Sequence, residues 1–397
     1  MNHLSDRINR LSESETLAMS RMSRELKAEG HDVINLSVGE PDFFTPDNIK
    51  EAGKQAIDGN FSFYPPVNGY QDLREAICRK LARDNNLAYT PDQIVVSTGA
   101  KQSIANAMLC LVNPGDEVII PTPYWVSYRE IVKMAEAKAV YVKAGIENHF
   151  KITPGQLEES ITDKTKMFIF SSPCNPTGSV YSREELRSLA AVFERHPHVY
   201  IISDEIYEHI NFGGKHESIA RFDAIKDRVV LVNGVSKGFA MTGWRLGYMA
   251  AHAEVAKACV KLQGQITSGA CSIAQRAALE AVETDPEVTR HMLEKFKERR
   301  DLVIKLLHEV PGVTANKPQG AFYLFINVKA CFGKYDGEQP VNDAAALCMY
   351  LLKKAHVAMV PGSAFGDDEC VRFSYATSNN LLIEAIDRIK KALSQLK

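Results

Sequence analysis

Four side chains that could do chemistry together follow three short apolar runs of this chain. Asn175 follows the first run, Asp204 and Tyr207 follow the second, and Lys237 follows the third. Successive groups are about one βαβ unit apart, which is the spacing of neighbouring parallel strands. In an open parallel sheet, ligands bind beyond the carboxyl ends of the strands. We therefore expect an amide, a carboxyl, a phenol and an amine to meet at one edge of a sheet.

The amine and the carboxyl indicate the kind of reaction. Lys237 lies among small and apolar residues, where desolvation lowers the pKa of an amine and favours the nucleophilic form that makes Schiff bases. A single lysine after a strand is usually a solvated charge, and a single aspartate there is often a helix N-cap. A buried Asp204, however, needs a cation or a proton donor, and a protonated pyridine nitrogen is such a partner.

A turn of small residues and an aromatic side chain extend this set. Gly99, Ala100 and Lys101 stand between an apolar run and an apolar helical stretch, so backbone N–H groups and the helix dipole would face an anion. The G-x-x-x-x-G-K-[ST] pattern of a nucleotide-binding loop is absent. Trp125 follows another run and could stack on a flat ring, although packing is the commoner role of such a residue. A lysine, a carboxylate, an aromatic ring and a phosphate-binding turn together are what pyridoxal phosphate requires.

The elements that must position these residues form an α/β pattern. The runs are continuously apolar, as strands buried on both faces must be, and they alternate with stretches of helical periodicity. Ser182-x-x-Glu185 has the pattern of a capping box that opens a crossover helix. We predict a mostly parallel central sheet covered by helices. Its predicted strands are residues 94–96, 117–120, 167–170, 199–202, 229–232 and 246–249.

The C-terminal third has a different pattern. It contains a long charged helical stretch, strand-like segments and a closing amphipathic helix, which together indicate a smaller α+β domain. The helical stretch covers residues 286–308, and the strand-like segments are 321–325 and 371–375. We predict a large α/β domain at residues 47–289 and a small α+β domain made of residues 1–46 and 290–397.

Composition excludes several classes of function. The 397 residues carry 47 Lys and Arg against 49 Asp and Glu, so there is no basic excess that would attract nucleic acid. No apolar run is long enough to span a bilayer and the N-terminal stretch is polar, which predicts a cytoplasmic protein without a membrane segment. The eight cysteines form no C-x-x-C pair and no H-E-x-x-H is present, so we expect scattered thiols and no metal site.

Several motifs in order give the chain a family resemblance. It resembles the class I pyridoxal-phosphate aminotransferases of fold type I, and within them the bacterial aspartate aminotransferase subgroup. The motifs that carry the resemblance are Ser37-Val-Gly39-Glu-Pro-Asp42, Tyr64-x-x-x-x-Gly69, Ser172-Pro-Cys-Asn-Pro-Thr-Gly178, Ser203-Asp-Glu-Ile-Tyr207, Ser236-Lys237, Met241-Thr-Gly-Trp-Arg-Leu-Gly247 and Val371-Arg-Phe-Ser-Tyr-Ala-Thr377.

The resemblance implies a role for each residue around the cofactor ring. Lys237 would hold pyridoxal 5′-phosphate as a Schiff base and then move the substrate α-proton. Asp204 would pair with the pyridine nitrogen and keep the ring protonated. Tyr207 and Asn175 would hydrogen-bond the ring oxygen, and Trp125 would stack on the ring. The implied phosphate ligands are Gly99, Ala100, Lys101, Ser236, Arg245 and Tyr64 of the partner subunit.

The resemblance also implies how substrate binds. Arg372 would hold the α-carboxylate bidentately, as the planar guanidinium permits, and Gly39, Asn175 and Trp125 would complete the substrate site. Dicarboxylate specialists of the family often supply a second arginine from the neighbouring subunit, for which we find no counterpart. In the bacterial subgroup a lysine at the position of Lys101 binds the distal carboxylate instead.

These roles imply a ping-pong aminotransferase that moves the amino group of L-aspartate to 2-oxoglutarate, giving oxaloacetate and L-glutamate. We expect a homodimer with shared active sites whose partners are small-molecule substrates, namely amino acids and 2-oxo acids. Alternatives that remain open are an aromatic amino acid, prephenate or alanine aminotransferase, or a lyase that needs no amino acceptor. A cofactor-binding domain of a transcription regulator is set aside, because the resemblance begins within about the first thirty residues and leaves no room for a DNA-binding module.

Overall fold

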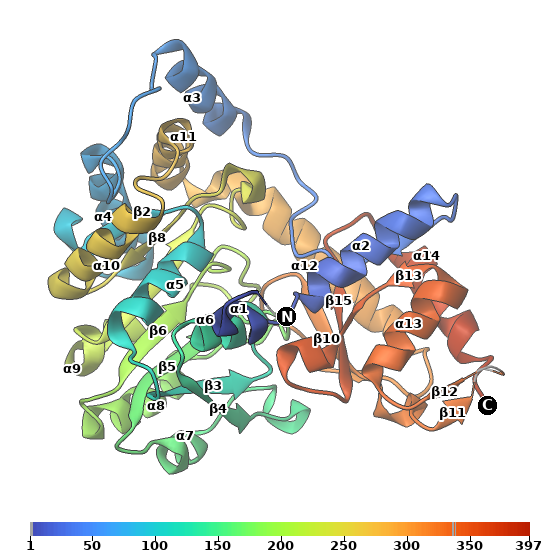
Figure 1. The fold of residues 1–397 in the computed structure, drawn as a ribbon. Helices are drawn as coiled ribbons and strands as arrows, with labels where there is room; N and C mark the ends of the chain where they lie inside the picture. Colours follow the sequence, from blue (N-terminus) through green and yellow to red (C-terminus); the bar gives the residue numbers. More distant parts are fainter. Residues whose placement is uncertain (1–2, 336, 338) are drawn as a thin grey trace.

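The computed structural model describes residues 3–335, 337 and 339–397 (Figure 1). Within them the main sheet has the strand order β2-β8-β7-β6-β5-β3-β4. Strand β8 runs antiparallel to its neighbours β2 and β7, and the other pairs are parallel. The mostly parallel sheet predicted from the apolar runs is therefore confirmed. The strands are β2 (Ile94–Ser97), β3 (Glu117–Thr122), β4 (Lys138–Lys143), β5 (Thr165–Ser171), β6 (Tyr200–Asp204), β7 (Val229–Gly234) and β8 (Gly247–Ala250).

Burial explains which strands the apolar runs revealed. Every residue of β7 is buried, and β3 and β8 are equally enclosed. Strand β4 was missed because most of its residues are partly or fully exposed, whereas β2, at the other edge of the sheet, is entirely buried and was predicted. A strand that is exposed to this extent needs no continuous apolar run, so its sequence carries little strand signal.

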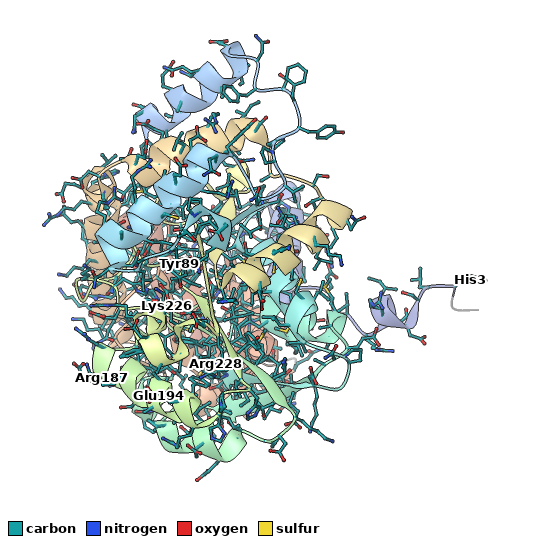
Figure 2. All side chains as sticks on the ribbon, turned by 90° about the vertical axis from the view of Figure 1, so that its left-hand side faces the viewer. His3, Tyr89, Arg187, Glu194, Lys226 and Arg228 are labelled. Carbon is teal, nitrogen blue, oxygen red and sulfur yellow. The ribbon has the colours of Figure 1, made fainter. Side chains whose placement is uncertain are left out.

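Helices cover the sheet and connect its strands. Helix α5 (Ala100–Leu111) follows β2 and packs on β7, β8 and α10 (Ala253–Ile266), while α11 (Ser272–Glu283) packs on α3 (Asp47–Asp58) and α4 (Gln71–Asn85). The predicted capping box opens α8 (Arg183–Arg195): the Ser182 hydroxyl accepts from the Glu185 N–H, and the Glu185 carboxylate accepts from the Ser182 N–H. On the side of the molecule that is at the left in Figure 1, Lys226 lies over the Tyr89 ring (Figure 2).

The C-terminal elements build a second core. The antiparallel sheet has the order β14-β15-β10-β9, and β10 pairs with β15. Its strands are β9 (Thr314–Ala315), β10 (Tyr323–Asn327), β14 (Val360–Pro361) and β15 (Cys370–Ser374). The predicted helix over 286–308 begins instead with a 3₁₀ turn, Pro286–Thr289, before α12 (Arg290–Leu307). The chain closes with α14 (Asn379–Leu393), which is the closing amphipathic helix predicted from the sequence.

The N-terminal segment joins this second core. Strand β1 (Ile34–Asn35) pairs with β13 (Val357–Ala358), and α2 (Glu15–Ala28) lies against β13 and β14 (Figure 1). Met19 of α2 belongs to the same apolar cluster as residues of α12, α13 (Ala344–Ala355) and α14. On these contacts we propose residues 1–46 with 290–397 as one domain and residues 47–289 as the other. Figure 2 shows α1 (Asp6–Asn9) projecting beyond the body of the molecule.

Two features of the described residues bear on function. None of the helices in this part of the chain combines the length and apolarity needed to cross a bilayer. Across the same residues, His, Cys, Asp and Glu side chains nowhere gather in a group of three or more that could hold a metal ion.

Candidate active site

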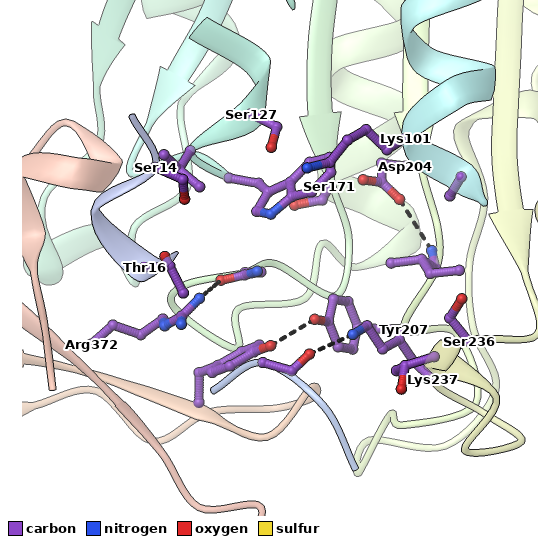
Figure 3. Close-up of a pocket in the computed structure, with 18 of the residues that line it drawn as sticks. Ser14, Thr16, Lys101, Ser127, Ser171, Asp204, Tyr207, Ser236, Lys237 and Arg372 are labelled. Carbon is purple, nitrogen blue, oxygen red and sulfur yellow. Dashed lines mark hydrogen bonds between the residues drawn. The ribbon is translucent and has the colours of Figure 1, made fainter. Parts of the chain in front are cut away.

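A cavity of about 300 Å³ opens at the carboxyl ends of β5, β6 and β7 (Figure 3). This is the place where an open parallel sheet binds its ligand. Its walls come from both groups of elements, since β15 and the N-terminal segment contribute as well as the main sheet. All the predicted site residues line it except Gly99 and Tyr64: Gly39, Ala100, Lys101, Trp125, Asn175, Asp204, Tyr207, Ser236, Lys237, Arg245 and Arg372.

Lys237 supplies an amine to the floor of this cavity. It follows β7, and its Nζ donates a hydrogen bond to the Gly39 carbonyl oxygen. The rings of Tyr207 and Phe322 each lie 5.9 Å from Nζ. Desolvation lowers the pKa of Lys237 to about 8, with Glu40 opposing the shift and Arg372 adding to it. An amine with this pKa releases its proton near neutral pH far more easily than a surface lysine.

Asp204 ends β6 and is almost completely buried. Its Oδ2 accepts a hydrogen bond of 2.7 Å from the Tyr128 hydroxyl, and its Oδ1 accepts one of 3.3 Å from the Ile206 N–H. Burial raises the pKa of Asp204 to about 6, while the hydrogen bond from Tyr128 opposes that shift. The carboxylate is therefore poised to gain further stabilisation from a cation in the cavity.

Arg372 carries a buried guanidinium on β15. Nη1 donates to Asn175 Oδ1 at 3.0 Å and Nη2 donates to the Ser37 carbonyl oxygen at 2.6 Å. The group is 2 % exposed, and its Nε has no hydrogen-bond partner in the described residues. Burial lowers the pKa of Arg372 from its usual value. A buried cation with an unused donor beside a cavity is a site for a carboxylate.

Tyr207 lies next to a second tyrosine, Tyr323, in the lining of the cavity. The two hydroxyl oxygens of Tyr207 and Tyr323 are 2.8 Å apart, and burial raises the pKa of Tyr207 well above its ordinary value. Tyr207 therefore keeps its proton at neutral pH, and its hydroxyl can donate a hydrogen bond to a neighbouring oxygen. Tyr323 comes from β10, so this pair connects the segment after β6 to the second sheet.

The opposite end of the cavity has the features of an anion site. Helix α5 begins at Ala100, and the first backbone N–H groups of a helix lack partners inside the helix. Gly99 adopts φ +83°, and a Cβ there would lie 2.5 Å from an Nη atom of Arg245. Glycine therefore leaves room for the guanidinium beside the helix start. Ser236 adds a hydroxyl to the lining.

Lys101 lies on the upper wall of the cavity in Figure 3, and Trp125 also lines the cavity. The Lys101 Nζ is 5.1 Å from the centroid of the Trp125 ring, an arrangement in which the ring quadrupole attracts the cation. Desolvation, followed by repulsion from Arg245, lowers the pKa of Lys101. Lys101 and Arg372 lie on opposite sides of the cavity, so it contains two separated cations (Figure 3).

Two predicted residues stand outside the cavity lining. Gly99 lies just behind it as the residue before α5, whereas Tyr64 is 97 % exposed. Tyr64 of the partner subunit as a phosphate ligand stays a prediction.

Sequence reasoning did not select Tyr128 and Tyr323, which hydrogen-bond the predicted residues Asp204 and Tyr207. Ser14 and Thr16 of the N-terminal segment, a stretch that resembles the substrate-closing segment of the bacterial subgroup, also line the cavity. The sequence does contain one weak indication of Tyr128. It lies about one helical turn after Trp125, a spacing at which two side chains of a helix are neighbours.

Comparisons with known proteins identify the family of this chain. A family model described as aminotransferase class I and II matches residues 31–389. A protein of Cereibacter sphaeroides named aspartate/prephenate aminotransferase is 48% identical over 393 residues, which cover 98% of this chain and 98% of the relative. The crystal structure of the aspartate aminotransferase from Rhizobium meliloti matches with a TM-score of 0.96 at 41% identity, covering 100% of both chains.

A second solved structure is the aspartate aminotransferase from Thermus thermophilus with maleate. It matches with a TM-score of 0.92 at 38% identity and covers 99% of this chain and 100% of that one. The family match extends over most of the sequence, and the fold agrees over its whole length. This chain belongs to the class I and II aminotransferases.

Proposed function

We propose that this chain uses pyridoxal 5′-phosphate to transfer the amino group of L-aspartate to 2-oxoglutarate, giving oxaloacetate and L-glutamate. One observation carries the proposal: the amine of Lys237, the buried carboxyl of Asp204 and the buried guanidinium of Arg372 line a single cavity. Amino-acid chemistry on this cofactor needs three groups: a nucleophilic amine, a counter-charge for the protonated ring, and a guanidinium that can bind a carboxylate bidentately.

The donor set at each end of the cavity fits the cofactor. The start of α5, the Ser236 hydroxyl and the Arg245 guanidinium suit a phosphate group, and the Gly99 position is kept free of a side chain beside Arg245. Asp204 would hold the pyridine N–H, and Trp125 would lie against the ring. Tyr207 and Asn175 would hydrogen-bond the ring oxygen.

The two cations account for a dicarboxylate substrate. Arg372 would bind the α-carboxylate, with Asn175 setting the orientation of the guanidinium through the 3.0 Å hydrogen bond. Lys101 would bind the distal carboxylate from the opposite wall, because its ammonium lies beside Trp125 at the cavity. The related Thermus thermophilus structure is described with maleate, which like aspartate carries two carboxylates.

Each residue of the site would have a separate role in the reaction. When bound, pyridoxal phosphate supplies an aldehyde that takes up the amino group and a ring that withdraws electrons. Lys237, with a pKa of about 8, would take the proton from the substrate α-carbon and deliver it to the carbon that was the aldehyde carbon of the cofactor. Asp204 keeps a negative charge at the ring end of the cavity. Ser14 and Thr16 line the cavity from the N-terminal segment and limit the access of water.

A second candidate substrate is prephenate. The Cereibacter sphaeroides relative is named for both aspartate and prephenate. Leu17, Val126 and Trp125 line the same cavity as the two cations, so an apolar wall is present for a carbon ring that also bears carboxylates. We propose prephenate as an additional amino acceptor rather than a replacement for 2-oxoglutarate.

We further propose a homodimer located in the cytoplasm. Phe44, Phe63 and Tyr64 are 90 %, 83 % and 97 % exposed, which is unusual for three large aromatic side chains on one stretch of chain. Covering them with a second copy would allow Tyr64 of the partner subunit to reach the phosphate. All eight cysteines are unbonded, as expected in a reducing compartment.

The test is a ranking of half-reactions. The enzyme loaded with pyridoxal phosphate is mixed separately with aspartate, glutamate, tyrosine, phenylalanine, alanine and arogenate, and the loss of the bound-cofactor absorbance is followed. Aspartate and glutamate should react fastest, and a measurable rate with arogenate would support prephenate as acceptor. Preference for alanine or tyrosine over aspartate would contradict the proposed specificity. Repeated release of product without any acceptor would indicate a lyase, because the half-reaction of an aminotransferase stops after one oxo acid per site.

A further inference from the structure

Tyr128 contacts the carboxyl of Asp204 on the side that faces away from the cavity lining. It lies in the first turn of α6 (Ser127–Met134) and is almost completely buried. Its hydroxyl donates the 2.7 Å hydrogen bond to Asp204 Oδ2. Tyr128 is absent from the lining of the main cavity, so it touches neither substrate nor cofactor space directly. Any effect on the reaction must therefore pass through the residues that Tyr128 contacts.

The direction of this hydrogen bond is determined by the environment. Burial raises the pKa of Tyr128 well above its ordinary value, so the phenol keeps its proton throughout the physiological range. A phenol that always carries its proton stabilises the ionised form of the carboxyl that it faces. Burial acts on Asp204 in the opposite sense, because it favours the neutral acid. Tyr128 thus counteracts the loss of charge that enclosure would otherwise cause.

Few other groups could replace this donor. The Ile206 N–H reaches the other carboxyl oxygen at 3.3 Å, which is a longer and weaker contact. The ammonium of Lys237 attracts Asp204, whereas Glu205 repels it. The titratable groups that influence or face the Asp204 carboxyl from the surrounding elements are Tyr128, Cys174, Glu205, Tyr207 and Lys237.

The same side chain also supports the aromatic wall. The Tyr128 and Trp125 rings meet edge to face, with centroids 5.5 Å apart and an interplanar angle of 88°. The Tyr128 N–H also donates to the Trp125 carbonyl oxygen at 2.9 Å. One residue is therefore in contact with both the carboxyl and the indole that would hold the cofactor ring.

We propose that Tyr128 is a positioning residue for the proposed transamination, whose hydroxyl keeps the Asp204 carboxylate charged and aimed at the ring nitrogen of pyridoxal phosphate. This inference rests on the proposed function, since it assigns that cofactor to the cavity. Tyr128 acts through Asp204 and makes no contact with the reacting atoms.

The test removes only the hydroxyl. Tyr128→Phe keeps the ring that packs on Trp125, so a change reports the hydrogen bond to Asp204. Tyr124→Phe is the matched control, because Tyr124 is also buried beside the site but stacks on Tyr141 instead. Dissociation constants for pyridoxal phosphate are measured on the full chain by titration between pH 5 and 8.5, together with kcat and KM for aspartate.

Tyr128→Phe should weaken cofactor binding about tenfold at neutral pH, as expected for the loss of a hydrogen bond to a charged group. The pH below which binding weakens should also rise, because Asp204 without its donor takes up a proton at higher pH. The phosphate of the ligand ionises in the same range, but this contribution is common to every variant. The apparent kcat should fall, while KM for aspartate stays nearly constant. Tyr124→Phe should behave as the unmodified chain.

A double-mutant cycle with Asp204→Asn distinguishes positioning from a general packing role. In the Asp204→Asn background, Tyr128→Phe should change cofactor affinity less than about twofold, because the amide no longer needs a donor to keep a charge. An equal loss in both backgrounds, or a Tyr128→Phe enzyme that binds cofactor with unchanged affinity and pH dependence, would overturn the inference. Failure of the unmodified chain to bind pyridoxal phosphate would instead reject the proposed function.

Discussion

At the scale of single residues, Lys237 combines two tasks, since its amine can both attach a carbonyl compound and carry a proton. We predict that Lys237→Ala loses the absorbance band of bound cofactor and at least about a thousandfold of the transamination rate, because attachment and proton transfer disappear together. Borohydride reduction followed by peptide mass analysis should label Lys237 alone. Lys166→Ala is the control, because Lys166 lies over Tyr200 instead of lining the cavity. Labelling of a different lysine would disprove the assignment.

Arg372 illustrates how geometry, beyond charge, matters at one residue. Its guanidinium is held by Asn175 and the Ser37 carbonyl at the same time, which a single ammonium cannot reproduce. Arg372→Lys should lower kcat/KM for aspartate about a hundredfold, mainly through KM, because the bidentate contact to the carboxylate is lost. The affinity for pyridoxal phosphate should change little, which a separate titration checks. A normal KM would remove Arg372 from the substrate site.

At the scale of elements, a buried ion pair connects α4 to the segment that follows β6. Lys80 donates to Glu208 and to Asn85, and both members of the pair are almost fully enclosed. Glu208 directly follows Tyr207, so this pair anchors the segment that carries a site residue. Attraction by Lys80, with a contribution from His209, outweighs burial and holds the pKa of Glu208 far below its usual value.

Lys80→Met should reduce the free energy of unfolding by about 3 to 5 kcal/mol, because it leaves a buried carboxylate without its partner. The double variant Lys80→Met with Glu208→Leu should recover much of that loss, and thermal unfolding of the three proteins measures both effects. Since the folded pKa of Glu208 is depressed, its stabilisation is present above the unfolded value of about 4.3 and is lost as the pH falls below it. A single variant as stable as the parent would show that the pair contributes nothing.

At the scale of the whole molecule, the exposed aromatic stretch around Tyr64 predicts an assembly. The parent chain should sediment at twice 44.1 kDa. Phe63→Asp should shift it toward the monomer, because a charge would enter a desolvated contact, and should weaken cofactor binding about tenfold through loss of Tyr64 of the partner subunit. Ile383→Asp, on the exposed face of α14, is the control. A Phe63→Asp protein that stays dimeric with full cofactor affinity would contradict this interface.

The sequence by itself determined the sheet edge at which the site lies. Continuous apolar runs identify strands buried on both faces, and right-handed crossovers bring their carboxyl ends to one edge, so Asn175, Asp204 and Lys237 had to converge. Two elements were not predicted from the sequence, the edge strand β4 and the 3₁₀ turn at Pro286–Thr289. Partial exposure of β4 leaves it without a continuous apolar run. The tighter 3₁₀ turn has no periodic pattern that separates it from the α-helix that follows.

Only the tertiary structure decided which side chains meet across the cavity. The contacts of Tyr128 with Asp204, Tyr207 with Tyr323 and Arg372 with Ser37 join residues far apart in the chain. Hydrophobic periodicity encodes how a segment folds and which face it buries. It does not encode the angle at which two packed layers approach each other, and that angle determines which buried donor finds which acceptor.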